Sequence, residues 1–275
     1  MIKLTVLVDN TPNPQNGDLG YEHGFSLFGE FDGIRFICDT GASDLFSINA
    51  ARLGIGIKDV DFSFMSHAHN DHTGGLKCLL ENTGACVFLS DISFRYRMFS
   101  NRHSPRKEIG IDQSIENLFS DRLRYISQSE WISDNIAAVK NDCYSYDSPY
   151  SNRFITVEKN GVESLDDFSH ELSLALDTPE GLIIISPCSH NGAVNIMDSC
   201  MRFTGRKNVR AFVGGLHFVD GPQAKLEAAR FIENLNCYFP DTTVITGHCT
   251  GNTAIAELAR YKGVEFFYSG KKITF

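Results

Sequence analysis

The sequence predicts an α/β fold, and three observations favour this class. Along most of the chain, segments with the hydrophobic pattern of a strand alternate with segments that have the spacing of an amphipathic helix. The 275 residues are 42% hydrophobic and 21% charged, with 23 Gly and 8 Pro, which is globular composition with enough apolar residues for a large core. The two halves of the chain are also similar in organisation, because in each half strands are followed by helices that pack on them.

The first half begins with three expected strands, the third of which ends in Asp39-Thr40-Gly41. Helical spacing follows, with Ser47 suited to cap that helix and Gly54 suited to end it. Strand alternation then returns, which gives the order of a βαβ unit. The elements expected in this half are strands at 1–8, 25–30, 33–40, 60–67 and 85–90, and helices at 47–54 and 73–84.

Regular patterning is lost between about 93 and 150. Between Ser93 and Arg124 seven Lys and Arg residues stand against four acids. We interpret this stretch as an irregular, cap-like insertion over the core of a single domain that spans 1–275.

Regular patterns resume in the second half, where the turns at Asn160-Gly161 and Pro179-Glu180-Gly181 separate strands. The expected elements are strands at 153–161, 171–181, 182–190, 209–215, 242–248 and 264–270, and helices at 193–203, 222–236 and 253–262.

Charge and cysteine content narrow the function classes. The formal net charge is −9, which disfavours nucleic acid and anionic membranes as partners, so an anionic substrate must be held by local cations. No apolar run has the ~20 residues of a membrane span, and the opening strand pattern lacks the order of a signal peptide. Eight scattered cysteines without CxxC spacing are expected to be reduced and mostly buried. We therefore expect a cytoplasmic protein.

The strongest signal for chemistry follows the strand at 60–67, where three histidines and an aspartate fall within six residues: His67, His69, Asp71 and His72. If the chain is extended at His67 and His69, their side chains project to the same side. A turn can then direct Asp71 and His72 toward a neighbouring point. Imidazole and carboxylate suit Zn²⁺, Mn²⁺ or Fe²⁺, so the spacing predicts one or two divalent transition metals.

This cluster resembles the His-x-His-x-Asp-His signature of the metallo-β-lactamase superfamily. The resemblance implies a four-layer αββα sandwich with an insertion over the active site, and a metal-activated water that attacks an electrophile. Further segments resemble one subgroup, whose named archaeal members are 7,8-dihydropterin-6-methyl-4-(β-D-ribofuranosyl)aminobenzene-5′-phosphate synthases, while most other members are called MBL-fold hydrolases. These segments are EHGFSLFGE, CDTGASDLFSINAARLGI, HELSL, PCSHNGAVNI, GGLHF and GHCTGNTA.

The usual Gly-His-Thr-x-Gly ligand and the bridging Asp of the superfamily are absent from this sequence. Where the bridging Asp would fall, the chain offers Cys188 and His190, and the subgroup resemblance favours His190 as the ligand. Cys188 is an alternative thiolate donor. His170 lies near the place of the missing histidine, but its spacing to the next strand fits poorly. His248 ends a strand and resembles the last metal-binding histidine of the superfamily.

Other candidate residues stand around this set. Asp39 follows an apolar strand, where its carboxylate can accept backbone N–H groups of the histidine loop and orient an imidazole ligand. His217 also ends a strand, as a contact to substrate or to a ligand, or as structural filler. Glu22 and His23 open the strand at 25–30, where they line the pocket or belong to a capped turn.

The leading hypothesis is a metal-dependent, zinc-containing hydrolase of a small phosphorylated or otherwise anionic substrate, with Asp71 and His190 as catalytic residues. The proposed metal ligands are His67, His69, Asp71, His72, His190 and His248. A first alternative is a pterin-related transferase or synthase in which the basic insertion holds a phosphate and its aromatic residues stack on a flat ring. A second is a non-catalytic protein that captures a ligand at its metal site. A nuclease is a weaker alternative, because the chain is acidic and lacks a long basic surface.

Overall fold

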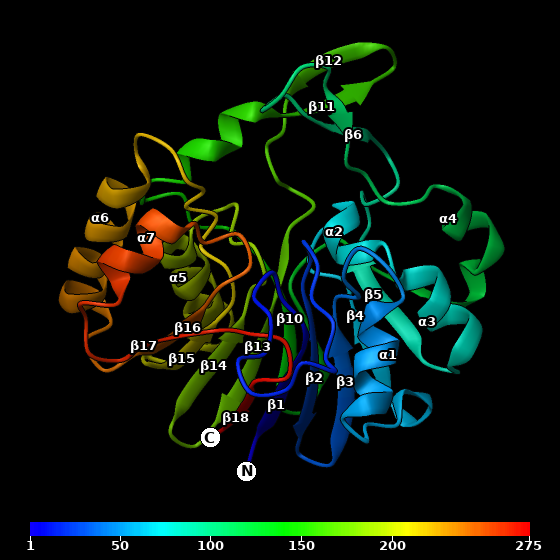
Figure 1. Ribbon diagram of the computed structural model, residues 1–275, viewed down its shortest axis with the longest axis horizontal. Coiled ribbons are helices and arrows are strands. Elements are labelled where there is room, and N and C mark those ends of the chain that lie inside the picture. The colour runs from blue at the N-terminus through cyan, green and yellow to red at the C-terminus, as the bar shows by residue number, and fades with distance from the viewer. The chain divides into compact units, whose positions relative to one another are not determined.

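A computed structural model describes residues 1–275, which form two compact units (Figure 1). The first unit consists of Met1–Ser127, Ile155–Asp166 and Phe267–Phe275, and the second of Gln128–Phe154 and Asp167–Phe266. Each unit therefore combines segments that are distant in sequence. That the two units make a single domain stays a prediction.

The first unit is built on a seven-stranded mixed sheet with the strand order β18-β1-β2-β3-β4-β5-β8. Its strands are β1 Lys3–Val8, β2 Ser26–Phe31, β3 Ile34–Cys38, β4 Phe62–Phe64, β5 Cys86–Ser90, β8 Leu123–Ile126 and β18 Lys272–Thr274. The first and last strands of the chain pair antiparallel, with Leu4 opposite Ile273, so both termini lie at the same end of the sheet in Figure 1.

The helices of this unit are α1 Leu45–Arg52, α2 Asn70–Thr73, α3 Leu76–Asn82 and α4 Ser114–Leu118, with short 3₁₀ turns η1 Ile57–Asp59 and η2 Ser120–Arg122. Helix α1 begins at Leu45, so Ser47 lies inside it and the expected cap at Ser47 is wrong. The reason is that the Ser43 hydroxyl accepts the N–H of Leu45, while Glu22 accepts the N–H groups of Ala42 and Ser43 and holds this turn in place.

The parallel strands of the first sheet place the histidine loop. Strand β4 pairs parallel with both β3 and β5, so the carboxyl ends of all three meet at one edge. Asp39 follows β3, and the stretch Ser66 to His72 follows β4. Residues 33 positions apart in the chain are thus brought to the same sheet edge.

The second unit is built on another seven-stranded sheet, with the order β17-β16-β15-β14-β13-β10-β9. Its strands are β9 Glu130–Ser133, β10 Ile136–Lys140, β13 Leu172–Thr178, β14 Gly181–Ile185, β15 Val209–Val213, β16 Thr243–Thr246 and β17 Val264–Phe266. Strands β14 to β17 are parallel neighbours. The loops after β14, β15 and β16 therefore leave the sheet at one edge, and they carry His190, His217 and His248.

Helices α5 Ala193–Thr204, α6 Ala224–Tyr238 and α7 Asn252–Leu258 and the 3₁₀ turn η3 Tyr150–Phe154 complete this unit. Helix α5 buries Ile196, Met197 and Cys200 against the sheet, in one apolar cluster with Phe231 of α6 and Leu258 of α7. Burial on this scale stabilises the unit by roughly 25 cal/mol for each Å² of apolar surface removed from water. None of the helices has both the length and the apolar composition that a membrane span requires.

The segment 93–150 is more regular than the sequence indicated. Strand β8 joins the first main sheet, and β9 and β10 join the second. A separate four-stranded sheet, in the order β12-β11-β6-β7, is formed by β6 Arg97–Ser100, β7 Lys107–Glu108, β11 Ile155–Lys159 and β12 Val162–Leu165. The strands within 93–150 have only two to five residues each, which is too short to show a period. The expected turn at Asn160-Gly161 is confirmed as the connection between β11 and β12, with φ of 52° and 78°.

Candidate metal centre

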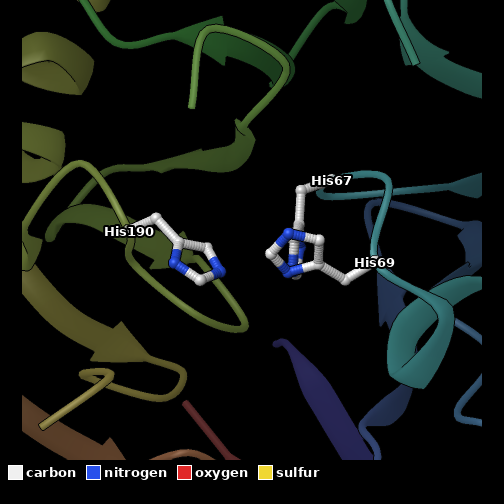
Figure 2. Close-up of side chains that lie close together, drawn as sticks. All are labelled: His67, His69 and His190. Carbon is white, nitrogen blue, oxygen red and sulfur yellow. The ribbon is translucent and has the colours of Figure 1, made fainter. Parts of the chain in front are cut away.

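Two imidazoles face each other in the loop after β4. His67 Nε2 lies 3.1 Å from His69 Nδ1, and the rings meet nearly edge to face at 77° with their centroids 4.5 Å apart (Figure 2). Both side chains are buried, with 1% and 4% exposure. His69 has extended backbone angles, so the two rings project to the same side, as the period of a strand requires.

The third histidine of the loop is held by Asp39. His72 Nδ1 donates to Asp39 Oδ2 over 2.6 Å, and Ser66 donates to the same carboxylate through its backbone N–H at 2.7 Å and its hydroxyl at 2.6 Å. All three residues are buried. A carboxylate that accepts the Nδ1 proton fixes the tautomer in which Nε2 carries the lone pair, which is how carboxylates orient imidazole ligands in metal sites.

The histidine loop packs closely against the turn after β3. Thr40 donates to the carbonyl of His72 through both its N–H at 2.7 Å and its hydroxyl at 3.0 Å. Gly74 follows the loop, and a Cβ at that position would lie 2.2 Å from the carbonyl oxygen of Ala42. Glycine is therefore required for the close approach that seats the loop.

Asp71 and His23 form a partly exposed pair beside this group. His23 Nε2 lies 3.3 Å from Asp71 Oδ2, and the same carboxylate oxygen is 3.8 Å from His72 Nε2. The His23 side chain is 72% exposed and that of Asp71 is 18% exposed. Glu22, by contrast, binds the turn before α1, where its carboxylate accepts a 2.7 Å hydrogen bond from the Ser43 hydroxyl. This agrees with the alternative in which Glu22 belongs to a capped turn.

In the second unit His190 is fully buried on the loop after β14, where Figure 2 draws it. Its Nδ1 lies 3.2 Å from Asn152 Oδ1, and Asn152 also donates to the His190 carbonyl over 2.8 Å. The amide oxygen can only accept, so Nδ1 carries the proton and Nε2 the lone pair. The ring stacks on Phe168 at 4.3 Å with an interplanar angle of 4°.

Glu171 holds the backbone of this loop. Its two oxygens accept the N–H groups of His190 at 2.6 Å and of Asn191 at 2.7 Å. Burial raises the pKa of Glu171, and the hydrogen bonds from Asn191 and His190 oppose that rise. His170, one residue earlier, is also buried, and its ring centroid lies 6.0 Å from that of Phe168.

The loops after β15 and β16 bring further histidines to this edge. His217 lies against His190 with ring centroids 4.1 Å apart, and its Nδ1 is 2.8 Å from the hydroxyl of Ser151. His248 is 6% exposed. One ligand atom from each of Cys188, His248 and Cys249 lies within 4.8 Å of the other two.

Several residues here have left-handed backbone angles that side chains rarely adopt. The values of φ are 58° for Asp39, 53° for His217 and 49° for His248. Such conformations cost about 1–3 kcal/mol each and persist where the surrounding structure enforces them, most often at functional sites. In each unit the strained backbone thus lies at strand ends that carry candidate residues.

Comparisons with known proteins agree with this geometry. The family model of the metallo-beta-lactamase superfamily matches residues 25–122, which include Asp39 and the whole histidine loop. The crystal structure of Tm1679, described as a metal-dependent hydrolase of the beta-lactamase superfamily, covers 100% of this chain and 99% of its own, with 26% identity and a TM-score of 0.81. The chain is similar to the metallo-β-lactamase superfamily in its histidine loop and in its fold.

One curated relative with a named activity is similar to this chain over most of its length. The chain is 25% identical to the 7,8-dihydropterin-6-methyl-4-(beta-D-ribofuranosyl)-aminobenzene-5'-phosphate synthase of Methanocaldococcus jannaschii, across 91% of this chain and 88% of that protein. The metallo-β-lactamase fold protein YhfI of Bacillus subtilis shares the fold, with a TM-score of 0.57 and 12% identity. The fold class and the family expected from the sequence are both confirmed.

The donor set fits a divalent metal of the kind that this superfamily binds. His67 and His69 present ring nitrogens to each other in a buried place, and His72 and His190 each have their Nδ1 proton directed to an oxygen acceptor. Neutral imidazoles whose second nitrogen is held in this way are suited to zinc and similar ions.

Sequence reasoning missed the residues that hold the second-unit histidines. Ser151, Asn152 and Glu171 contact His217 or His190, and Cys249 contacts the His217 backbone. Ser151 and Asn152 follow the stretch taken as an irregular insertion, where nothing periodic marks them. The one sequence feature near them is the tyrosine-rich segment that precedes Ser151. Its composition does not indicate which histidines lie close to Ser151 and Asn152 in the fold.

Proposed function

We propose that the protein is a metal-dependent hydrolase that uses water as the nucleophile on a small anionic substrate. The observation that carries the proposal is the buried pair of ring nitrogens, His67 Nε2 and His69 Nδ1, 3.1 Å apart. Nearby, a fully buried carboxylate orients His72. Buried polar clusters of this kind are costly unless a cation or a complete hydrogen-bond network compensates them.

The proposed ligands are His67, His69, Asp71 and His72 in the first unit and His190 and His248 in the second. The superfamily signature supports the four first-unit residues, and the tautomer set by Asn152 supports His190. A divalent metal bound there supplies Lewis acidity and lowers the pKa of a coordinated water to about 7. Zinc is the proposed ion, with manganese and iron as alternatives.

Asp71 is proposed to accept the proton that the attacking water loses. Its carboxylate is partly exposed and lies 3.3 Å from Nε2 of His23, whose side chain is 72% exposed. A proton taken up by Asp71 therefore has a short path through the His23 ring to solvent. Asp39, in contrast, is fully buried and engaged by Ser66 and His72, so it orients groups and does not exchange protons with solvent.

Two arginines of the 93–124 stretch, Arg97 and Arg106, are paired with acids. Arg97 forms ion pairs with Glu108 at 2.7 Å and with Glu158 at 3.5 Å, and Arg106 is paired with Glu158 and Glu163. These cations stabilise the small sheet and are already neutralised by acids. We therefore propose that the metal ions themselves provide the positive charge that attracts an anionic substrate.

The aromatic residues of the same stretch are also committed to packing. Phe99 is buried under the guanidinium groups of Arg97 and Arg106, whose central carbons lie 5.1 and 3.9 Å from its ring centroid. Trp131 lies on β9 and packs against Phe203 at 5.7 Å.

A second candidate function is a synthase that joins a pterin to a phosphorylated aryl riboside. The observation in its favour is the similarity to the archaeal synthase along 91% of this chain. Both candidates use the same metal positions, and they differ in whether water or a second organic substrate attacks.

The test is a substrate panel with metal-loaded protein. Phosphate monoesters and diesters, lactones, and a dihydropterin together with a phosphorylated aryl riboside are incubated with zinc-loaded and chelator-treated protein, and products are identified by mass spectrometry. We expect hydrolysis products that depend on the metal and disappear in the His69→Ala variant. A joined pterin product would instead establish the synthase. Retention of a compound without turnover in any arm would contradict both and favour ligand capture.

We also propose a cytoplasmic location, supported by the scattered cysteine spacing, and a small-molecule partner, phosphorylated or pterin-like. Fluorescence of a tagged protein in cells checks the first, and co-purified small molecules identified by mass spectrometry check the second.

A further inference from the structure

The second unit contains a cluster of two thiols and one imidazole. Cys188 follows β14, while His248 and Cys249 follow β16, two strands away in the sheet. One ligand atom from each of the three residues lies within 4.8 Å of the other two. Cys188 and His248 are buried, with 3% and 6% exposure, and Cys249 is partly buried.

Local contacts direct the Cys249 sulfur toward Cys188. Its thiol donates to the Cys188 carbonyl oxygen over 3.7 Å and accepts the backbone N–H of His217 over 3.2 Å. Gly215 makes room for this sulfur, because a Cβ there would lie 2.4 Å from it. These contacts hold the Cys249 sulfur on the same side as Cys188, where both can reach one ion.

We infer that Cys188, His248 and Cys249 form a sulfur-ligated metal position in the second unit. The inference rests on the proposed function for the role of His248 and adds two thiolate ligands to it. Each thiol would release its proton to solvent on coordination. Two cysteines and one histidine are a donor set that binds zinc and leaves a fourth tetrahedral position open.

This ligand set has two chemical consequences. Thiolates select soft and borderline metals, so zinc is favoured over manganese and magnesium at this position. Two thiolates also neutralise the charge of a divalent ion, whereas an all-imidazole position leaves it positive. An anionic substrate group is therefore attracted more strongly to a metal held by imidazoles alone than to the sulfur-ligated one.

The test uses cobalt as a spectroscopic substitute for zinc in the full-length protein. Cobalt bound by thiolates gives a sulfur-to-metal charge-transfer band in the near ultraviolet, which imidazole and carboxylate ligands do not give. We expect this band in the wild type, a loss of about half its intensity in Cys188→Ser and in Cys249→Ser, and its absence in the double variant. Cys237→Ser is the matched control, since Cys237 is exposed on α6, and it should leave the band unchanged.

A second measurement requires no substitution, in case the serine variants fail to fold. X-ray absorption at the zinc edge of the wild-type protein should show sulfur at about 2.3 Å in addition to nitrogen or oxygen at about 2.0–2.1 Å. Metal-loaded protein with no sulfur scattering and no charge-transfer band overturns the inference. Failure of the proposed function would have another signature: full metal content and unchanged turnover after His69→Ala.

Discussion

Nδ1 of His72 donates a 2.6 Å hydrogen bond to the carboxylate of Asp39, and both side chains are completely buried. The same carboxylate accepts two hydrogen bonds from Ser66, the residue that opens the histidine loop. One side chain at the end of β3 thus fixes both the backbone start of the loop and the ring of its last histidine. The direction of the His72 Nε2 lone pair depends on that arrangement.

Asp39→Asn should weaken metal binding without unfolding the protein. The amide has nearly the same shape, but if its NH₂ group faces His72 it donates to Nδ1 and moves the ring proton to Nε2. That tautomer has no lone pair at Nε2. Loss of such an orienting partner typically lowers metal affinity 10–100-fold, and titration against a chromophoric chelator measures this. Asp241→Asn, an exposed site on another segment, is the control and should bind metal normally. Equal affinities for the two variants would contradict the role given to Asp39.

Removal of a central imidazole should empty the centre but spare the fold. We expect the wild type to purify with one to two equivalents of a first-row transition metal, and His69→Ala to lose metal and activity while it remains soluble and folded. Elemental analysis and circular dichroism measure the two effects. The exposed His103 provides the matched variant, His103→Ala, which should keep its metal. Insoluble His69→Ala protein would point to a structural site instead.

The sequence predicted the elements that have a strong period and missed those that depend on distant neighbours. The helix expected at 193–203 is found as Ala193–Thr204, because its buried face repeats over three turns. Strand β12 was missed, since all four of its residues are exposed and it exists only through its pairing with β11. The final strand β18 was missed for a similar reason, because β1 supplies its hydrogen bonds from the other end of the chain.

The same distinction applies to the candidate site. The spacing of His67, His69 and His72 is local, so the sequence displayed it directly. The Asp39 contact could be anticipated because a carboxylate at a strand end lies at the same sheet edge as the loop. The Asn152 and Glu171 contacts to His190 join segments 38 and 19 residues away, and no local pattern indicates such pairs.

We expect the free energy of unfolding to depend on pH through Glu227, which contacts the start of the 3₁₀ turn η3. This carboxylate on α6 accepts the backbone N–H of Tyr150 over 2.6 Å, and burial raises its pKa above the ordinary value of 4.5 despite that bond. A raised pKa in the folded state means that ionisation opposes folding, so the free energy of unfolding falls as pH rises from about 4.5 through the folded pKa. Glu227→Gln keeps an acceptor for Tyr150 and cannot ionise. Urea unfolding at a series of pH values should show the variant gaining stability relative to the wild type across that window, whereas parallel curves would contradict the assignment.

Asn152 is expected to act through the His190 ring. Asn152→Ala removes the acceptor for Nδ1 and the donor to the His190 carbonyl, so the ring is free to adopt the other tautomer and to rotate. We expect metal affinity to fall about 10–100-fold. Asn152→Asp still accepts the Nδ1 proton, although it cannot donate to the carbonyl, and should retain more affinity than the alanine variant. The order of the two affinities is the critical result, since a merely structural role would make both variants equally weak.

The comparison of His190 with His170 decides which histidine completes the centre. Both rings are buried in the second unit, so burial does not distinguish them. His190 has its Nδ1 directed to an amide oxygen and its backbone N–H held by Glu171, which together fix a ring whose Nε2 is a metal acceptor. His190→Ala should therefore reduce metal occupancy and abolish turnover. His170→Ala should leave metal occupancy nearly unchanged, even if it weakens substrate binding.

The charge of the ligand at position 190 should also matter. A neutral ligand in the place of the usual bridging carboxylate leaves the bound metal more positive. Substrate anions should therefore compete more strongly in the wild type than in a His190→Asp variant that still binds metal. Metal content by mass spectrometry and inhibition by inorganic phosphate measure these effects. If His170→Ala lost the metal while His190→Ala kept it, the ligand would be His170 and the charge argument would no longer hold.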